Sequence, residues 1–202
     1  LRDADIAMYR AKALGKARYE LFDIVMRDQI MRRLALETEL KRALELGEFR
    51  LWYQPIIALE PRQLHGFEAL LRWQHPERGL LAPGEFMQVL EDTGLIVPLG
   101  IWVLEEACRQ FADWRHRYSS AAPLKISVNL SARQFRDTSF VQRAMAILTA
   151  NDIPAAALAA EVTETALIQD TQDAAVMLRQ LEMLGFEIHM DDFGTGYSSL
   201  SY

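Results

Sequence analysis

The chain of 202 residues predicts an α/β fold in which a parallel sheet closes into a TIM-like (β/α)8 barrel. Strand-like segments alternate with helix-like segments through most of the sequence, which is typical of right-handed βαβ units. Half of the residues are apolar and a quarter are charged, so the chain can bury a sizeable core. Polar side chains recur near the carboxyl ends of the expected strands, where barrel enzymes carry their active sites.

Residues 1–24 predict the end of a domain whose body lies upstream. Ala4, Ala7 and Ala11 form one helical stripe, and the apolar piece 19–22 could be a strand. One helix and one strand cannot bury a core by themselves. We therefore expect this segment to be the remnant of another domain.

Residues 25–47 predict a linker helix, and residues 48–202 predict the main domain. Met26, Ile30 and Leu34 recur at helical spacing, and Gly47 ends the helix. In the main domain, strands are expected at 49–59, 64–73, 124–130, 159–163 and 186–192, and helices at 83–91, 101–117, 138–151 and 170–184. The four tryptophans are expected in the core or barrel wall, and the single cysteine, Cys108, is expected to be buried in a helix.

Period-two alternation places the polar side chains of these strands. Glu68 and Arg72 share one face of the second strand, while Asn129 and Glu161 lie near the carboxyl ends of the next two. Taken alone, Glu68 and Arg72 could form a structural ion pair, and Asn129 could cap a turn. Because several oxygen ligands fall at the same end of the sheet, the pattern favours a functional site over these structural roles.

The fifth strand adds two neighbouring carboxylates, Asp191 and Asp192, which would face opposite sides of a regular strand. The strand must therefore bend there, and Gly194 and Gly196 permit such a bend. All of these ligands are oxygens, which suits Mg²⁺ or Mn²⁺ and disfavours zinc. Two such ions, bridged by Asp191, could stabilise the attacking and leaving oxygens of a phosphodiester, and Arg72 could bind its phosphate.

Overall charge and hydropathy restrict the partners of the chain. The net charge is −6 without a run of five like charges, so we expect no nucleic acid polymer as a ligand. The sequence contains neither an apolar stretch of about 18 residues nor the pattern of a signal peptide. We expect a cytoplasmic protein or the cytosolic part of a membrane-attached sensor.

Six motifs follow one another in the main domain. They are YQPI at 53–56, EALLRW at 68–73, PGEF at 83–86, NLS at 129–131, EVTE at 161–164 and DDFGTG at 191–196. In sequence and order they resemble the EAL family of cyclic di-GMP phosphodiesterases, from about residue 36 onward. The resemblance implies an EAL-type barrel that hydrolyses cyclic di-GMP to linear pGpG in bacterial signalling.

The resemblance also implies roles for individual residues. The metal ligands would be Glu68, Asn129, Glu161, Asp191 and Asp192, and Glu68, Asp191 and Asp192 would be catalytic. Arg72 and Gln54 would contact the substrate, and Glu164 would anchor the loop after the fifth strand.

The first residues, LRDADIAMYRAK at 1–12, resemble the C-terminal end of the diguanylate cyclase (GGDEF) family. That resemblance implies a nucleotide phosphate contact from Lys12 and Lys16 in an intact cyclase. Solvated lysines on a linker helix are the favoured alternative, and cyclase activity is not expected because the family's signature loop is absent from the sequence.

The family pattern continues with a lysine, a further glutamate and an eighth strand that these 202 residues do not contain. Because such a barrel needs about 250 residues, we expect the chain alone to be inactive and to self-associate, as a homodimer or otherwise. Two alternatives to a phosphodiesterase stay open: a non-catalytic cyclic di-GMP receptor that signals through a partner, and a truncated scaffold. Upstream cyclase or sensor domains are the expected partners in either case.

Overall fold

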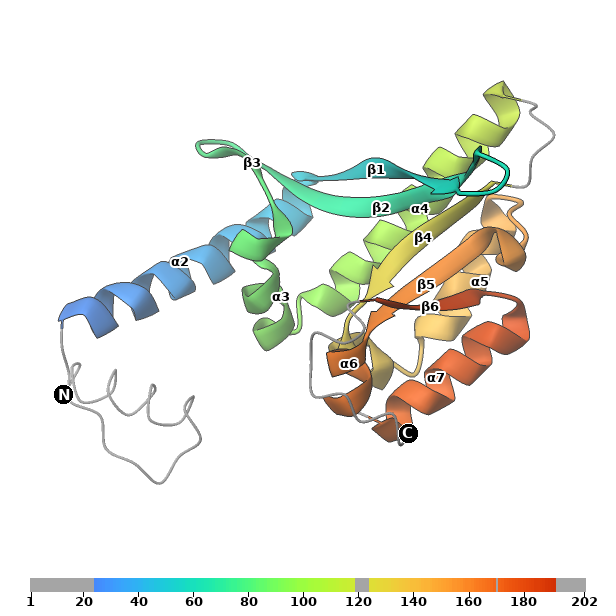
Figure 1. Ribbon diagram of the computed structural model, residues 1–202. Helices are drawn as coiled ribbons and strands as arrows, with labels where there is room; N and C mark the ends of the chain where they lie inside the picture. The colour runs from blue at the N-terminus through green and yellow to red at the C-terminus, as the bar shows by residue number, and fades with distance from the viewer. Residues whose placement is uncertain (1–23, 119–123, 170, 192–202) are drawn as a thin grey trace.

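The computed structural model describes residues 24–118, 124–169 and 171–191 (Figure 1). The expected elements before residue 24 lie outside these ranges, as does the predicted site residue Asp192. The first described element is helix α2 (Ile24–Leu46), which confirms the helix expected at 25–47 and ends before Gly47 at φ 65°. Figure 1 shows its first half extending away from the sheet.

The sheet combines an antiparallel edge with a parallel centre. Strands β1 (Phe49–Ala58) and β2 (Gln63–His75) form a hairpin, and β3 (Gly79–Leu81) pairs antiparallel with the end of β2. Strands β4 (Lys125–Leu130), β5 (Leu158–Thr163) and β6 (Glu187–Asp191) continue the sheet from β2 in parallel. The order is β1-β2-β4-β5-β6, so the carboxyl ends of the four parallel strands meet along one edge.

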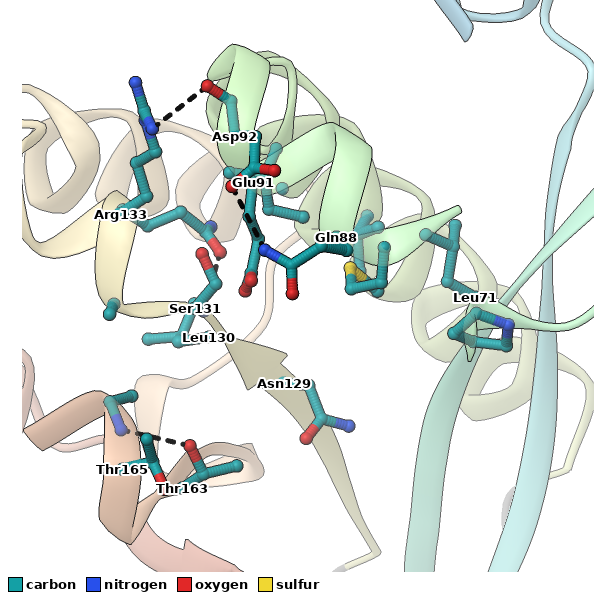
Figure 2. A pocket seen from close by; sticks show the side chains of 18 of the residues that line it. Leu71, Gln88, Glu91, Asp92, Asn129, Leu130, Ser131, Arg133, Thr163 and Thr165 are labelled. Carbon is teal, nitrogen blue, oxygen red and sulfur yellow. Dashed lines mark hydrogen bonds between the residues drawn. The ribbon is translucent and has the colours of Figure 1, made fainter. Parts of the chain in front are cut away.

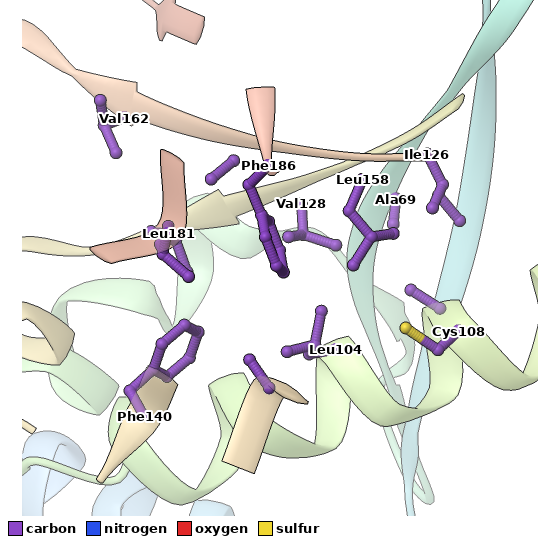
Figure 3. Packing of buried hydrophobic residues seen from close by; sticks show 14 of the residues in the cluster. Ala69, Leu104, Cys108, Ile126, Val128, Phe140, Leu158, Val162, Leu181 and Phe186 are labelled. Carbon is purple, nitrogen blue, oxygen red and sulfur yellow. The ribbon is translucent and has the colours of Figure 1, made fainter. Parts of the chain in front are cut away.

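Period-two alternation gives the parallel strands one buried apolar face. On it, Ile126 and Val128 of β4 and Leu158 of β5 are at most 3% exposed. The helices α4 (Ile96–Arg117), α5 (Phe140–Ala150) and α7 (Thr171–Leu184) cover this face. Figure 3 shows the resulting core, in which the labelled helical side chains are Leu104, Cys108, Phe140 and Leu181. Cys108 is fully buried in α4, as predicted.

A second core cluster joins the linker helix to the hairpin. Its fully buried members include Leu40 of α2, Phe49 of β1 and Trp73 of β2, and the Phe49 ring also contacts Phe86. The second half of α2 is therefore an integral part of the domain.

Two predicted helices differ from the observed ones. The expected helix 83–91 is divided into a 3-10 turn, η1 (Pro83–Glu85), and helix α3 (Met87–Thr93), because Phe86 leaves helical geometry and buries its ring. Helix α4 begins at Ile96, before the expected residue 101, since Pro98 lies in its first turn, where no backbone N–H is needed.

The sequence did not predict the short helical elements next to β4 and β5. They are η2 (Ala132–Arg136) after β4, η3 (Ala155–Ala157) before β5, and α6 (Glu164–Gln169) after β5. Among the described residues, no single helix is both long and apolar enough to cross a membrane, although α3 and α4 together, bent by 119°, reach that length and composition.

Candidate functional site

The polar face of the sheet is opposite the helix-covered one. Residues paired across parallel strands point to the same side, and the register pairs Asn129 with Glu161 and Thr163 with Asp191. Glu68 pairs with Ser127, which lies two residues before Asn129 and therefore shares its face. The alternation predicted from the sequence thus brings Glu68, Asn129, Glu161 and Asp191 to one face.

Glu68 and Asn129 are in direct contact. The Asn129 side-chain amide donates a hydrogen bond to Glu68 Oε1 at 2.9 Å, which links β2 to β4. An asparagine carbonyl and a glutamate carboxylate held side by side in this way offer two oxygen donors to one cation.

Glu161 lies in an acidic environment. Its partial burial is the largest cause that raises the carboxyl pKa, and the charges of Glu68 and Asp191 raise it further. A hydrogen bond from the buried Ser127 hydroxyl and the charge of His189 oppose that rise. The three carboxylates therefore repel one another, and a cation between them would relieve that repulsion.

The described residues bring together only part of the predicted ligand set. Within them, no three His, Cys, Asp or Glu side chains converge closely enough to hold an ion by themselves. The oxygen donors that do converge suit a hard divalent ion. Asp191 ends β6 at the exposed edge of the sheet, and Asp192 lies outside the described residues.

Arg72 lies apart from these carboxylates on the β1–β2 hairpin. It follows Glu68 by four positions along β2, which corresponds to about 13 Å of extended backbone. Its guanidinium carbon is 5.4 Å from the centre of the Trp52 ring, and Nη1 donates to the Leu71 carbonyl at 2.7 Å. Trp52 is 53% exposed, so the expectation that it packs in the core is wrong, whereas Trp73 is fully buried.

The hairpin also positions the second predicted substrate contact. Gln54 of β1 is exposed and pairs with Glu68 of β2 across the antiparallel ladder. Its side chain therefore lies on the polar face beside a predicted ligand.

Comparison with known proteins shows the family to which this chain belongs. Residues 37–202 match the sequence model of the EAL domain. The chain belongs to the EAL domain family. It is 42% identical over 200 residues to MucR of Pseudomonas aeruginosa, named a bifunctional diguanylate cyclase/cyclic di-GMP phosphodiesterase. It is 40% identical over 201 residues to the cyclic di-GMP phosphodiesterase PdeR of Escherichia coli.

These matches cover 99% and 100% of this chain but only 29% and 30% of MucR and PdeR. The chain therefore spans less than a third of the length of these curated relatives. A solved structure of the MucR phosphodiesterase in complex with c-di-GMP has a TM-score of 0.74 at 43% identity. It matches 82% of this chain and 66% of that one, which confirms the predicted EAL-type fold.

Glu164 occupies the junction after β5 in this EAL domain. It begins helix α6 and is 9% exposed, while the neighbouring Thr163 Oγ1 accepts a hydrogen bond from the Ala166 amide at 3.2 Å. The loop that Glu164 is expected to anchor follows β6 and lies outside the described residues, so its role stays a prediction.

A pocket of about 650 Å³ adjoins the polar face beside the middle of β2 and the carboxyl end of β4 (Figure 2). Asn129 lies at its border with the carboxylates, and α3 and η2 supply Glu91, Ser131 and Arg133. The sequence interpretation missed these residues, and it also missed Ser127. The same period-two rule that selected Asn129 would have selected Ser127, but no local pattern connects Glu91 with Arg133.

Proposed function

We propose that this EAL domain is the catalytic part of a phosphodiesterase that hydrolyses cyclic di-GMP to linear pGpG with Mg²⁺ or Mn²⁺. The observation that carries the proposal is the contact between Glu68 and Asn129 beside Glu161 on one face of the sheet. The functions for which MucR and PdeR are named, and the c-di-GMP in the complex of the MucR phosphodiesterase, support the choice of substrate.

The proposed ligand set is Glu68, Asn129, Glu161, Asp191 and Asp192, of which Glu68, Asp191 and Asp192 are the proposed catalytic residues. When bound, the divalent ions would supply positive charge at the scissile phosphate and lower the pKa of a water molecule. The reaction consumes one water: its oxygen bonds to phosphorus, the P–O3′ bond breaks, and the 3′ oxygen takes a proton.

Arg72 is the proposed phosphate contact. The guanidinium offers a planar fork of donors that matches two phosphate oxygens. Stacking on Trp52 holds that plane on the polar side of the hairpin. Gln54, exposed on β1 next to Glu68, is the proposed second contact with the substrate.

We further propose that residues 1–24 end a diguanylate cyclase domain, that 25–47 form a linker helix, and that 48–202 form the body of the EAL domain. The second half of the linker helix packs on that body, and the match to the family model begins within the helix, at residue 37. Similarity to MucR over 99% of the chain supports this division, because MucR is named for both activities. In the proposed setting the protein is cytoplasmic or the cytosolic part of a sensor, self-associates, and works with its upstream domain.

A second function is a receptor that binds cyclic di-GMP without turnover. The observation that favours it is that no three acidic, His or Cys side chains of the described ranges converge on an ion site. A receptor would bind the dinucleotide through Arg72 and the pocket, with no need for a complete ligand set.

The test is chromatographic detection of pGpG after incubation of cyclic di-GMP with Mg²⁺ or Mn²⁺. It is run with the 202-residue chain, with the full-length natural protein, and with Glu68→Ala in the latter. Glu182→Ala is the matched control, because Glu182 is exposed on α7.

Turnover that needs a divalent ion and Glu68, but not Glu182, supports the phosphodiesterase. Binding without turnover in the full-length protein selects the receptor instead. Absence of both binding and turnover overturns both functions. Turnover by the 202-residue chain alone would contradict the expectation that further strands are needed.

A further inference from the structure

Strand β4 lies between two strands that each carry a proposed metal ligand. Its neighbour β2 carries Glu68, and its neighbour β5 carries Glu161. The Asn129 amide of β4 donates to Glu68 Oε1 at 2.9 Å. The Ser127 hydroxyl, two residues earlier on the same face of β4, donates to Glu161. Strand β4 therefore supplies one hydrogen bond to the carboxylate on each of its two sides.

The Ser127 side chain is enclosed by the neighbouring strands. It is 1% exposed, and its register partners are Glu68 on β2 and Ala159 on β5. Ala159 ends in a methyl group, so the longer Glu161 side chain, two positions later on the same face, can reach the hydroxyl beside it. A buried hydroxyl is costly unless it is hydrogen-bonded. The bond to Glu161 thus satisfies the donor as well as the acceptor.

The other donors toward the amino end of this face contact a different carboxylate. The Lys125 ammonium of β4 donates to Glu187 of β6. The second oxygen of Glu187 lies 3.4 Å from His189 Nε2. Glu187 therefore occupies both side chains. Among the described side chains, it is Ser127 that donates a hydrogen bond to Glu161.

A hydrogen bond to one oxygen restricts the orientation of a ligand carboxylate. Glu161 is half-buried, and the charges of Glu68 and Asp191 repel its carboxylate. Without a donor, the Glu161 side chain would rotate to separate these charges, and an ion would have to reorient it on binding. A hydroxyl that holds one oxygen leaves the other oxygen for the ion. Hydrogen-bond partners of metal ligands commonly contribute about 10- to 100-fold to metal affinity.

We propose that Ser127 is a positioning residue for the hydrolysis, and that its hydroxyl holds the Glu161 carboxylate in the orientation that binds the divalent ion. The inference rests on the proposed function and deepens it, because Glu161 is one of the proposed ligands. Ser127 contacts neither the substrate nor the ion, and it acts through Glu161. Strand β4 then has two tasks: Asn129 offers a carbonyl oxygen to the ion, and Ser127 orients the carboxylate of the next strand.

The test is calorimetric titration of the metal-free full-length protein with Mn²⁺, in the wild type and in Ser127→Ala. Alanine removes the hydroxyl and leaves every proposed ligand in place. We expect the Kd for Mn²⁺ to rise about tenfold or more. Turnover of cyclic di-GMP should fall at low Mn²⁺ and should return to within about threefold of the wild-type rate at saturating Mn²⁺, because the ligands are unchanged.

Two control variants isolate the hydroxyl. Ser127→Thr keeps it and places a residue that is common in strands, so its Kd for Mn²⁺ should stay near the wild-type value. Thr149→Ala removes an exposed hydroxyl of α5 that donates to the Met145 carbonyl at 2.9 Å, and it should leave the Kd unchanged. Urea denaturation of the metal-free proteins is measured in parallel. A purely structural role of Ser127 would lower the free energy of unfolding without changing the Kd of the folded protein.

The outcomes separate this inference from the proposed function. A Kd for Mn²⁺ in Ser127→Ala within about twofold of wild type overturns the positioning role, while turnover by the wild type keeps the phosphodiesterase. An equal loss of affinity in Ser127→Thr, or low turnover by Ser127→Ala at saturating Mn²⁺, overturns the role too. A wild-type protein that binds no Mn²⁺ overturns both proposals. If Ser127→Ala does not fold, Ser127→Cys offers a weaker donor of similar shape, and an unchanged Kd in that variant also overturns the role.

Discussion

On the face that α4, α5 and α7 cover, the strands present Val128, Leu158 and Val162, each at most 3% exposed. On the other face, strands β4 and β6 present Asn129 and Asp191, which are exposed, and β5 presents the half-buried Glu161. Alternate residues of one backbone thus serve two needs. The apolar face removes surface from water and stabilises the sheet, while the polar face gathers carboxylates whose mutual repulsion opposes folding. Substitutions on the two faces should therefore separate stability from ligand binding.

The largest effect is expected on the covered face. Leu104 of α4 is 1% exposed within the core, so Leu104→Ala should lower the free energy of unfolding by about 2 to 5 kcal/mol. Urea denaturation measures this change. Met183→Ala on α7, where the side chain is 87% exposed, should change it by less than about 0.5 kcal/mol. A loss below about 1 kcal/mol for Leu104→Ala would mean that this face is not the stabilising one.

An intermediate effect is expected at the hairpin. Arg72→Lys keeps the charge but loses the planar fork and the stacking on Trp52. We expect the Kd for cyclic di-GMP to rise about tenfold, with stability within about 0.5 kcal/mol of wild type. Calorimetric titration gives the first quantity and urea denaturation the second.

Lys125→Arg supplies a matched exchange of cations, because Lys125 pairs with Glu187 at the opposite end of the sheet. The Kd of Lys125→Arg for cyclic di-GMP should stay at the wild-type value. If Arg72→Lys left the Kd unchanged, charge alone would explain binding at this position. If both exchanges weakened binding alike, the effect would not be specific to Arg72. Either result would contradict the proposed role of the Arg72 plane.

The smallest effect is expected for the pH dependence of stability, through Asp137 between η2 and α5. Burial of Asp137 raises the pKa of its carboxyl, but hydrogen bonds from Ser139 and the pairing with Arg143 outweigh burial and lower that pKa below its ordinary value. A carboxyl whose pKa is lowered by folding stabilises the protein above the unfolded value, and that contribution is lost as pH falls through the folded pKa. Asp137→Asn should therefore be less stable near neutral pH, by up to about 1 kcal/mol.

Tm measured from about pH 7 down to about pH 3 checks this difference. The wild-type and Asp137→Asn curves should converge at the acid end. Parallel curves over the whole range would show that the ionised Asp137 contributes nothing to stability. On the polar face the direction is opposite, because burial, and after it the charges of Glu68 and Asp191, raise the pKa of Glu161.

Sequence periodicity was sufficient for the parts of the molecule that depend on neighbours along the chain. The positions of Glu68, Asn129 and Glu161 within their strands predicted that they lie at one end of the sheet, and the strand register confirms this. The hydrogen bond between Glu68 and Asn129 depends on the pairing of β2 with β4, which the sequence did not predict. The start of α4 was missed because Pro98 and Gly100 resemble a break. Pro98 needs no donor in the first turn, and a Cβ at Gly100 would lie 2.1 Å from Gln134 Nε2.

What depends on tertiary proximity could not be predicted. Trp52 is as apolar as a core residue, but it lies on the polar face of the edge strand β1, where its ring is 53% exposed and stacks on Arg72. Arg133 lies 41 positions after Asp92, whose carbonyl it binds. Only this contact between α3 and η2 brings Arg133 and Glu91 to one pocket.

Cys108 has a practical consequence for such experiments. It is the single cysteine of the 202 residues, it is fully buried in α4, and burial raises the pKa of its thiol to about 12. At neutral pH it is therefore almost entirely the unreactive thiol form. A cysteine introduced at an exposed position, such as residue 183 on α7, would then be the only fast-reacting sulfur in the chain. Fluorophores or spin labels could be attached at one chosen position without first removing the native residue.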